Sequence, residues 1–155
     1  MRLFPLLLLT ACAADGRGHI SGEMGSHPFE KIVTAFHGGP FVALFDHQVS
    51  CEDTWWMDQS YSDQNAPDAE DGLMLQFTFQ DDPVVGTLSV AGAGAVSASG
   101  IFLDRAQYEV FRGRDGTVTL DEVSEDDMVG TFAVTLSDGA VEGDFHSTWC
   151  RNMTP

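Results

Sequence analysis

Hydrophobic and polar residues alternate with a period of two along most of the chain from Ile20 onward. The clearest run covers residues 73–80, where apolar side chains alternate with mostly polar ones, and a second run covers residues 131–137. This period places successive side chains on opposite faces of a β-strand. No stretch has the spacing of an amphipathic helix of useful length. Further strands are expected over residues 18–24, 29–36, 40–47, 84–90, 96–104 and 106–112, and around Val118 and Leu120.

These strands are short, and Gly, Pro, Asn or Asp residues separate them. Many short strands without helices between them are typical of two architectures, in which sheets pack face to face or one sheet closes on itself. We therefore expect an all-β fold, namely an antiparallel β-sandwich or β-barrel of roughly ten short strands.

The Asp138-Gly139 dipeptide predicts a tight hairpin between the last two strands, because both residue types tolerate positive φ angles. If these two residues form the turn, Leu136 lies opposite Val141 and Phe132 lies opposite Phe145. Apolar side chains then meet on one face of the hairpin. A one-residue slip would instead bury the acidic residues of the second strand.

The N-terminus predicts export. Arg2 precedes the short apolar run Leu6–Leu9, which is the layout of a secretory signal and is too short to span a bilayer. Leu9-Thr10-Ala11-Cys12 resembles the lipobox of bacterial lipoproteins, which implies cleavage before Cys12 and lipidation of that residue. Several acyl chains would anchor the protein stably in a membrane. Ala13 follows the cysteine, which in lipoproteins resembles the signal for release to the outer membrane.

The expected organisation is therefore a signal peptide over residues 1–11, a lipidated tether over 12–18 and a single β domain over 19–155. A chain of 155 residues fits one domain. Its expected location is the bacterial cell envelope, lipid-anchored in the outer membrane.

Two cysteines remain once Cys12 carries lipid, and they are Cys51 and Cys150. In an oxidising compartment two such cysteines are expected to pair. The alternative is a thiolate zinc site. That alternative is weakly supported because the chain has no Cys-x-x-Cys spacing.

Several short motifs resemble those of small uncharacterised bacterial lipoproteins. They are Ile20-Ser21-Gly22, His27-Pro28-Phe29, Asp46 shortly before Cys51, Gly116–Leu120, Gly130–Phe132, Asp138-Gly139, Gly143–Phe145 and Cys150. The match extends over about residues 20–150 and consists of strand and turn patterns. The resemblance implies a β fold and a Cys51–Cys150 pairing, and it implies no catalytic activity.

The chain is strongly acidic, with 7 Lys and Arg against 24 Asp and Glu and a formal charge of −17. Nucleic acids and anionic lipid headgroups select clustered basic residues. The few basic residues here are scattered, so we expect no nucleic-acid partner.

The segment from Glu52 to Asp71 is the candidate functional region, because it combines carboxylates and aromatic residues without any Lys or Arg. A loop of this length in a compact domain is usually functional or disordered. Its candidate calcium ligands are Asp53, Asp58, Asp63, Asp68 and Asp71, and its candidate binding aromatics are Trp55, Trp56 and Tyr61. Exposed aromatics can stack on a glycan or anchor an envelope protein. The alternatives are a solvated acidic loop and aromatics that cover one end of the core.

No catalytic or cofactor motif is complete. Residues 111–122 match only the second half of a calcium-binding EF-hand loop, and a turn at Asp115-Gly116 leading into a strand explains them better. No Gly-x-Ser-x-Gly motif occurs. The histidines lack metal-ligand spacing; they are His19, His27, His37, His47 and His146. We therefore expect a non-catalytic binding or structural module. The alternative is a hydrolase-like envelope enzyme whose site is assembled from residues remote in sequence.

Overall fold

The computed structural model describes residues 18–52, 72–91, 94–104 and 107–153. These residues form ten β-strands and a 3₁₀ helix at their C-terminal end. The elements are β1 (Ile20–Met24), β2 (His27–Pro28), β3 (Thr34–Gly38), β4 (Phe41–Phe45), β5 (Gly72–Phe79), β6 (Gly86–Ser89), β7 (Val96–Asp104), β8 (Gln107–Val123), β9 (Asp127–Leu136), β10 (Gly139–Trp149) and η2 (Arg151–Met153).

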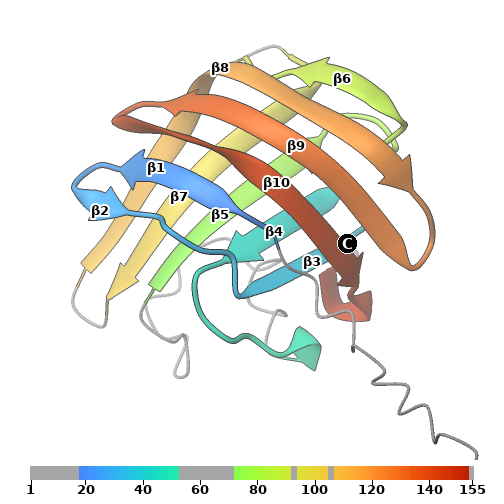
Figure 1. Ribbon diagram of the computed structural model, residues 1–155, viewed down its shortest axis with the longest axis horizontal. Coiled ribbons are helices and arrows are strands. Elements are labelled where there is room, and N and C mark those ends of the chain that lie inside the picture. The colour runs from blue at the N-terminus through green and yellow to red at the C-terminus, as the bar shows by residue number, and fades with distance from the viewer. Residues whose placement is uncertain (1–17, 53–71, 92–93, 105–106, 154–155) are drawn as a thin grey trace, which may run out of the picture.

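Seven of the strands form a closed ring in the order β10-β3-β4-β5-β7-β8-β9, with β9 returning to β10 (Figure 1). Strands β1 and β2 extend the sheet beside β10, and β6 extends it beside β8. The expected all-β fold is thereby confirmed, and the closed ring makes it barrel-like. One strand pairing of the ring is parallel, where Thr148 pairs with Phe36 and Trp149 with His37 to join β10 to β3.

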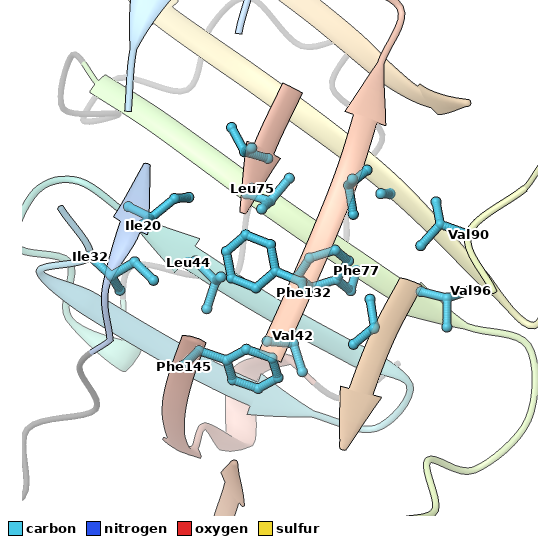
Figure 2. Close-up of a cluster of buried hydrophobic side chains, with 14 of the residues drawn as sticks. Ile20, Ile32, Val42, Leu44, Leu75, Phe77, Val90, Val96, Phe132 and Phe145 are labelled. Carbon is cyan, nitrogen blue, oxygen red and sulfur yellow. The ribbon is translucent and has the colours of Figure 1, made fainter. Parts of the chain in front are cut away.

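Apolar side chains on the inward faces of the strands fill the barrel (Figure 2). Phe77, Phe132 and Phe145 meet at its centre, with ring centroids 5.4 to 6.4 Å apart. Each ring comes from a different strand, and all three are almost completely buried. The sequence alternates with a period of two because every second residue along these strands faces this core.

The predicted register of the last hairpin is wrong by two residues. Val141 pairs with Val134 instead of Leu136, and Gly143 pairs with Phe132. The turn residues of this hairpin bond to neighbouring elements. The Ser137 N–H donates to the Arg112 carbonyl of β8, and the Asp138 carbonyl accepts from the Gly25 N–H in the β1–β2 turn. A two-residue shift leaves the same side chains facing inward, so the hydrophobic pattern is satisfied by either register.

The Asp115-Gly116 dipeptide lies within a strand, contrary to the turn expected there. Strand β8 runs through it for 17 residues, and the register against β9 shifts between Gly113 and Asp115. Gly116 has a φ of 132°, which side-chain-bearing residues rarely adopt. The Asp115 carboxylate accepts a hydrogen bond from the Gly116 N–H at 2.8 Å. The dipeptide thus forms a bulge that bends one long strand where the sequence predicted two separate ones.

The strand expected over residues 29–36 begins later, at Thr34. Phe29 and Ile32 are buried although they precede the strand. Phe29 N–H donates to the Gly22 carbonyl, and Ile32 makes an isolated bridge to Gly18. Burial of apolar side chains in an irregular segment therefore produced a strand-like sequence pattern.

No helix among the described residues is long and apolar enough to cross a membrane.

Candidate functional site

The predicted disulfide is present. Cys51 and Cys150 are bonded across a sequence separation of 99 residues, with their Cα atoms 5.5 Å apart. Cys150 follows β10 directly, and Cys51 lies five residues after Asp46 along the chain. The bond therefore attaches Cys51, which directly precedes the 52–71 segment, to the end of the barrel's last strand.

A second hydrophobic cluster surrounds this disulfide on the outside of the barrel. Its buried members are Ala43, Phe45, Val49, Met74, Ile101, Cys150 and Met153. Strands β4 and β5 consequently bury residues on both faces, which explains the continuous apolar run from Phe41 to Phe45. The segment after β4 and helix η2 both contribute to this cover, so the base of the loop is part of a packed structure.

Polar contacts fix the loop base as well. The Asp46 carboxylate oxygen Oδ1 lies 2.8 Å from the backbone N of Leu73 and 2.7 Å from His47 Nδ1. Both groups donate to it, so one carboxylate joins the residues that precede and follow the 52–71 segment. A Cβ atom at Gly72 would overlap this Asp46–His47 pair, so close packing explains the glycine.

Thr34 stabilises the bend formed by residues 46–49, directly after β4. Its hydroxyl donates to the His47 carbonyl at 3.0 Å and accepts from the Val49 N–H at 3.2 Å. Thr34 is buried, and both hydrogen-bonding roles of its hydroxyl are used. The bend over residues 46–49 is therefore held by side chains as well as by the disulfide that follows it.

The predicted ligands and aromatics of the loop lie outside the described residues. They are Asp53, Asp58, Asp63, Asp68 and Asp71, together with Trp55, Trp56 and Tyr61. The lipidation candidate Cys12 also lies outside them. Within the part of the chain that the structure describes, no group of three or more His, Cys, Asp or Glu residues is placed to hold a metal ion.

Three of the histidines lie beside a carboxylate, although their sequence spacing gave no indication of a site. His47 Nδ1 contacts Asp46, and His146 Nε2 lies 2.7 Å from Asp127 Oδ1 on neighbouring strands. His27 Nε2 lies 3.8 Å from a Glu109 oxygen, and its ring stacks on Phe102 with the ring centroids 3.7 Å apart. These pairs are spread over different parts of the barrel.

His37 differs from these three because it is buried inside the barrel, with 2% of its surface exposed. Its Nδ1 lies 3.2 Å from Ser147 Oγ, and the Ser147 hydroxyl lies 3.1 Å from the Met128 carbonyl. A carbonyl only accepts, so Ser147 donates its single hydrogen to Met128 and accepts one from His37. The Nδ1 atom of His37 therefore carries the hydrogen, and its Nε2 atom is an acceptor.

The His37 Nε2 atom is buried and has no hydrogen-bond partner among the described residues. Burial lowers the pKa of His37 below its usual value, although a hydrogen bond to the Ser147 backbone and the charges of Asp127 and Asp126 act in the opposite direction. Burial therefore favours the neutral form of the ring. Sequence reasoning missed this group, because it joins residues 110 positions apart and no spacing signals it.

Trp149 covers the same end of the barrel and was also missed. Its surface is 46% exposed. Its ring meets the His37 ring edge-on, with centroids 5.7 Å apart and planes at 68°. Its backbone N–H donates to the Asp126 carbonyl at 2.9 Å, which places Trp149 beside the acidic turn between β8 and β9.

No protein-family model, curated protein or solved structure matches the chain. The structure defines its class as an all-β protein with a closed, barrel-like sheet and a disulfide between Cys51 and Cys150.

Proposed function

We propose that the protein is a lipid-anchored module of the bacterial cell envelope, placed in the outer membrane, which serves as a binding or structural scaffold. The observation that carries this proposal is the lipobox-like sequence Leu9-Thr10-Ala11-Cys12 behind a short signal-like run. Lipidation of Cys12 would attach the tether over residues 13–18 and then the β domain to a membrane surface.

The Cys51–Cys150 disulfide supports an exported location, because such bonds persist in oxidising compartments and are rare in the cytosol. After this pairing, Cys12 is the remaining cysteine of the three in the chain. A disulfide and one lipidated cysteine would together account for all three cysteines of the chain.

The packed interior of the barrel favours binding at its surface. The inward faces carry large apolar side chains that contact one another, as expected for a small barrel whose lumen serves as the core. We therefore assign binding of an envelope protein or a glycan to the 52–71 segment, with Trp55, Trp56 and Tyr61 as contact residues. The fixed base formed by Cys51, Asp46 and Thr34 supports this role.

No observation favours the enzyme alternative. His37 and Ser147 form a serine–histidine pair, but the serine is completely buried. Its hydroxyl also donates to Met128, whereas a nucleophilic serine must donate to the histidine that acts as its base. This pair therefore supplies no nucleophile.

The test is metabolic labelling with palmitate followed by membrane fractionation of the full chain in a bacterial host. Wild-type protein should incorporate label and sediment with membranes, whereas Cys12→Ala should lose the label and become soluble. Cys51→Ala is the matched control, since it also removes one cysteine but should keep the label. Equal labelling of wild type and Cys12→Ala would refute the lipoprotein assignment.

A further inference from the structure

Strand β6 (Gly86–Ser89) lies at one end of the sheet path, outside the closed ring (Figure 1). It pairs with β8 on one side, and no strand among the described residues pairs with its other side. The opposite end of the path is β2, which has two residues and contains Pro28. Proline lacks an N–H and a short strand offers little to pair with, so both features protect a sheet edge. Strand β6 has four residues and contains neither proline nor a charged residue, so its edge can accept another strand.

The hydrogen-bond pattern shows which backbone groups face the free side of β6. Thr87 Oγ1 lies 2.9 Å from Thr119 Oγ1, and such close side chains are typical of a directly opposed pair that exchanges no backbone hydrogen bonds. The Val90 N–H donates to the Gly116 carbonyl, which likewise directs the backbone groups of even-numbered residues toward β8. Thr87 and Ser89 therefore present their N–H and C=O groups to the open edge.

The side chains of β6 give this edge one apolar face and one polar face. Leu88 is partly buried and packs against the core of the barrel. Thr87 and Ser89 are exposed. Because side chains alternate across a strand, an added strand would continue both faces if it alternated apolar and polar residues.

Two exposed valines directly precede β6. Val84 is 62% exposed and Val85 is 64% exposed, which makes them the most exposed large apolar side chains of the described residues. A Cβ atom at Gly86, whose φ is 142°, would meet no atom within 4 Å, so the space at this end of β6 is open. Valine packs well against a neighbouring strand, and the pair offers apolar surface to one.

Carboxylates surround the same end of β6. Gly86 pairs with Leu120, so the residues that follow Leu120 on β8 lie beside the valines that precede Gly86. The carboxylates on these two segments are Asp81, Asp82, Asp121 and Glu122. The chain has no Lys or Arg from residue 32 to residue 104 or from residue 115 to residue 150. Arg112 and Arg114 lie on β8 beyond the opposite end of β6, so the valine end is acidic.

These charges select the partner strand. A second copy of the chain would bring another formal charge of −17 to this edge, and charged residues beside an edge strand commonly prevent such self-pairing. The same carboxylates attract a basic segment. Addition of an extended peptide to a sheet edge uses backbone hydrogen bonds for affinity and alternate side chains for specificity.

We propose that β6 binds an extended segment of another protein in which β-branched apolar residues alternate with lysine or arginine. The segment pairs with the free backbone groups of Thr87 and Ser89, and its apolar side chains continue the Leu88 face. Its basic residues lie toward the valine end, where the carboxylates are. This surface consists of residues other than the 52–71 segment, so it goes beyond the proposed function and does not depend on lipidation.

Fluorescence anisotropy of a labelled peptide of alternating valine and lysine provides the measurement. The full chain carries Cys12→Ala, so that no acyl chain contributes to binding. Titration at pH 7 and constant ionic strength should give saturable binding. The same peptide with N-methyl groups on alternate residues keeps its charge and loses its pairing donors, so it should bind about tenfold more weakly. A peptide of alternating valine and glutamate should show no saturable binding.

Two variants locate the binding on β6. Val85→Lys should weaken the valine–lysine peptide about tenfold, because it replaces an apolar contact with a like charge. Val110→Lys is the matched control, since Val110 is also exposed but lies on the part of β8 that pairs with β7. Thr87→Pro removes an N–H from the free edge and should weaken binding as well. Circular dichroism checks that each variant is folded, and if Thr87→Pro does not fold, the N-methylated peptide and Val85→Lys still decide.

The proposal is overturned if the valine–lysine peptide shows no saturable binding, or if its N-methylated form binds equally well. Equal effects of Val85→Lys and Val110→Lys would also overturn it, because binding would then depend on overall charge. Sedimentation of the protein alone should show a monomer. A dimer that Val85→Lys dissociates would replace the basic segment with a second copy of the chain as the occupant of this edge.

Discussion

His37 and Ser147, which lie 110 residues apart in the sequence, form a buried hydrogen bond of 3.2 Å where β3 and β10 close the barrel. Strand β3 meets β10 through only two residue pairs, and one of them joins His37 to Trp149. A side-chain hydrogen bond therefore supplements a short backbone ladder at the one parallel contact of the ring. Burial at this closure lowers the pKa of His37 and so favours its neutral form, and the hydrogen bond fixes its tautomer.

Acidification should destabilise the protein through His37. Burial holds its pKa below the ordinary value of 6.5, so the unfolded chain binds the proton more readily than the folded one. The contribution of His37 to stability is complete above about pH 6.5 and is lost as the pH falls toward the lower, folded-state pKa. The groups that act on it are Ser147, Asp126, Asp127 and His146.

Urea unfolding of wild type and His37→Gln at several values between pH 8 and pH 5 measures this effect. The free energy of unfolding should fall more steeply with acidification in wild type than in the variant. Parallel curves would show that His37 does not contribute, because the other histidines are present in both proteins and cancel in the comparison.

Loss of the Cys51–Cys150 bond should lower stability by about 2–5 kcal/mol, since the bond constrains a long loop in the unfolded chain. Thermal unfolding of the Cys51→Ala, Cys150→Ala double variant against wild type is the measurement. A reductant should lower the melting temperature of wild type and leave the double variant unaffected. Two free thiols in the purified wild-type protein would contradict the assignment.

Asp46→Ala should destabilise the loop base by about 1–3 kcal/mol, because it removes the acceptor for Leu73 N–H and for His47 Nδ1. Amide exchange at Leu73 should increase selectively. Asp82→Ala is a suitable control, since that residue is an exposed aspartate near the far end of β5. If both variants lost the same small amount of stability, the Asp46 contacts would have no structural importance.

The double substitution Trp55→Ala and Trp56→Ala distinguishes the two interpretations of the 52–71 segment. If the pair binds an envelope protein or glycan, binding should weaken while the β-type circular dichroism and the melting temperature stay close to wild type. If the pair covers the core, truncation should cost several kcal/mol and lower the melting temperature markedly. Added calcium should raise the melting temperature only if the carboxylates converge on one ion.

Local sequence patterns predicted some strands of this fold correctly and the register of the last hairpin incorrectly. The run over residues 73–80 correctly predicted β5, because inward and outward positions alternate along any strand with a buried face. The Asp138-Gly139 signal correctly located a hairpin and gave the wrong register. The turn residues bond to the β1–β2 turn and to β8, and these neighbours are outside any local window of sequence.

The sequence by itself determined the all-β class and the pairing of Cys51 with Cys150, because strand periodicity and cysteine count are properties that the chain carries locally. Only the tertiary structure decided that the sheet closes, that Asp46 joins both sides of the loop, and that His37 is buried between Ser147 and Trp149. These features depend on contacts between residues far apart in the chain. Their energies depend on burial and on distance in space, which the order of residues does not encode in any short pattern.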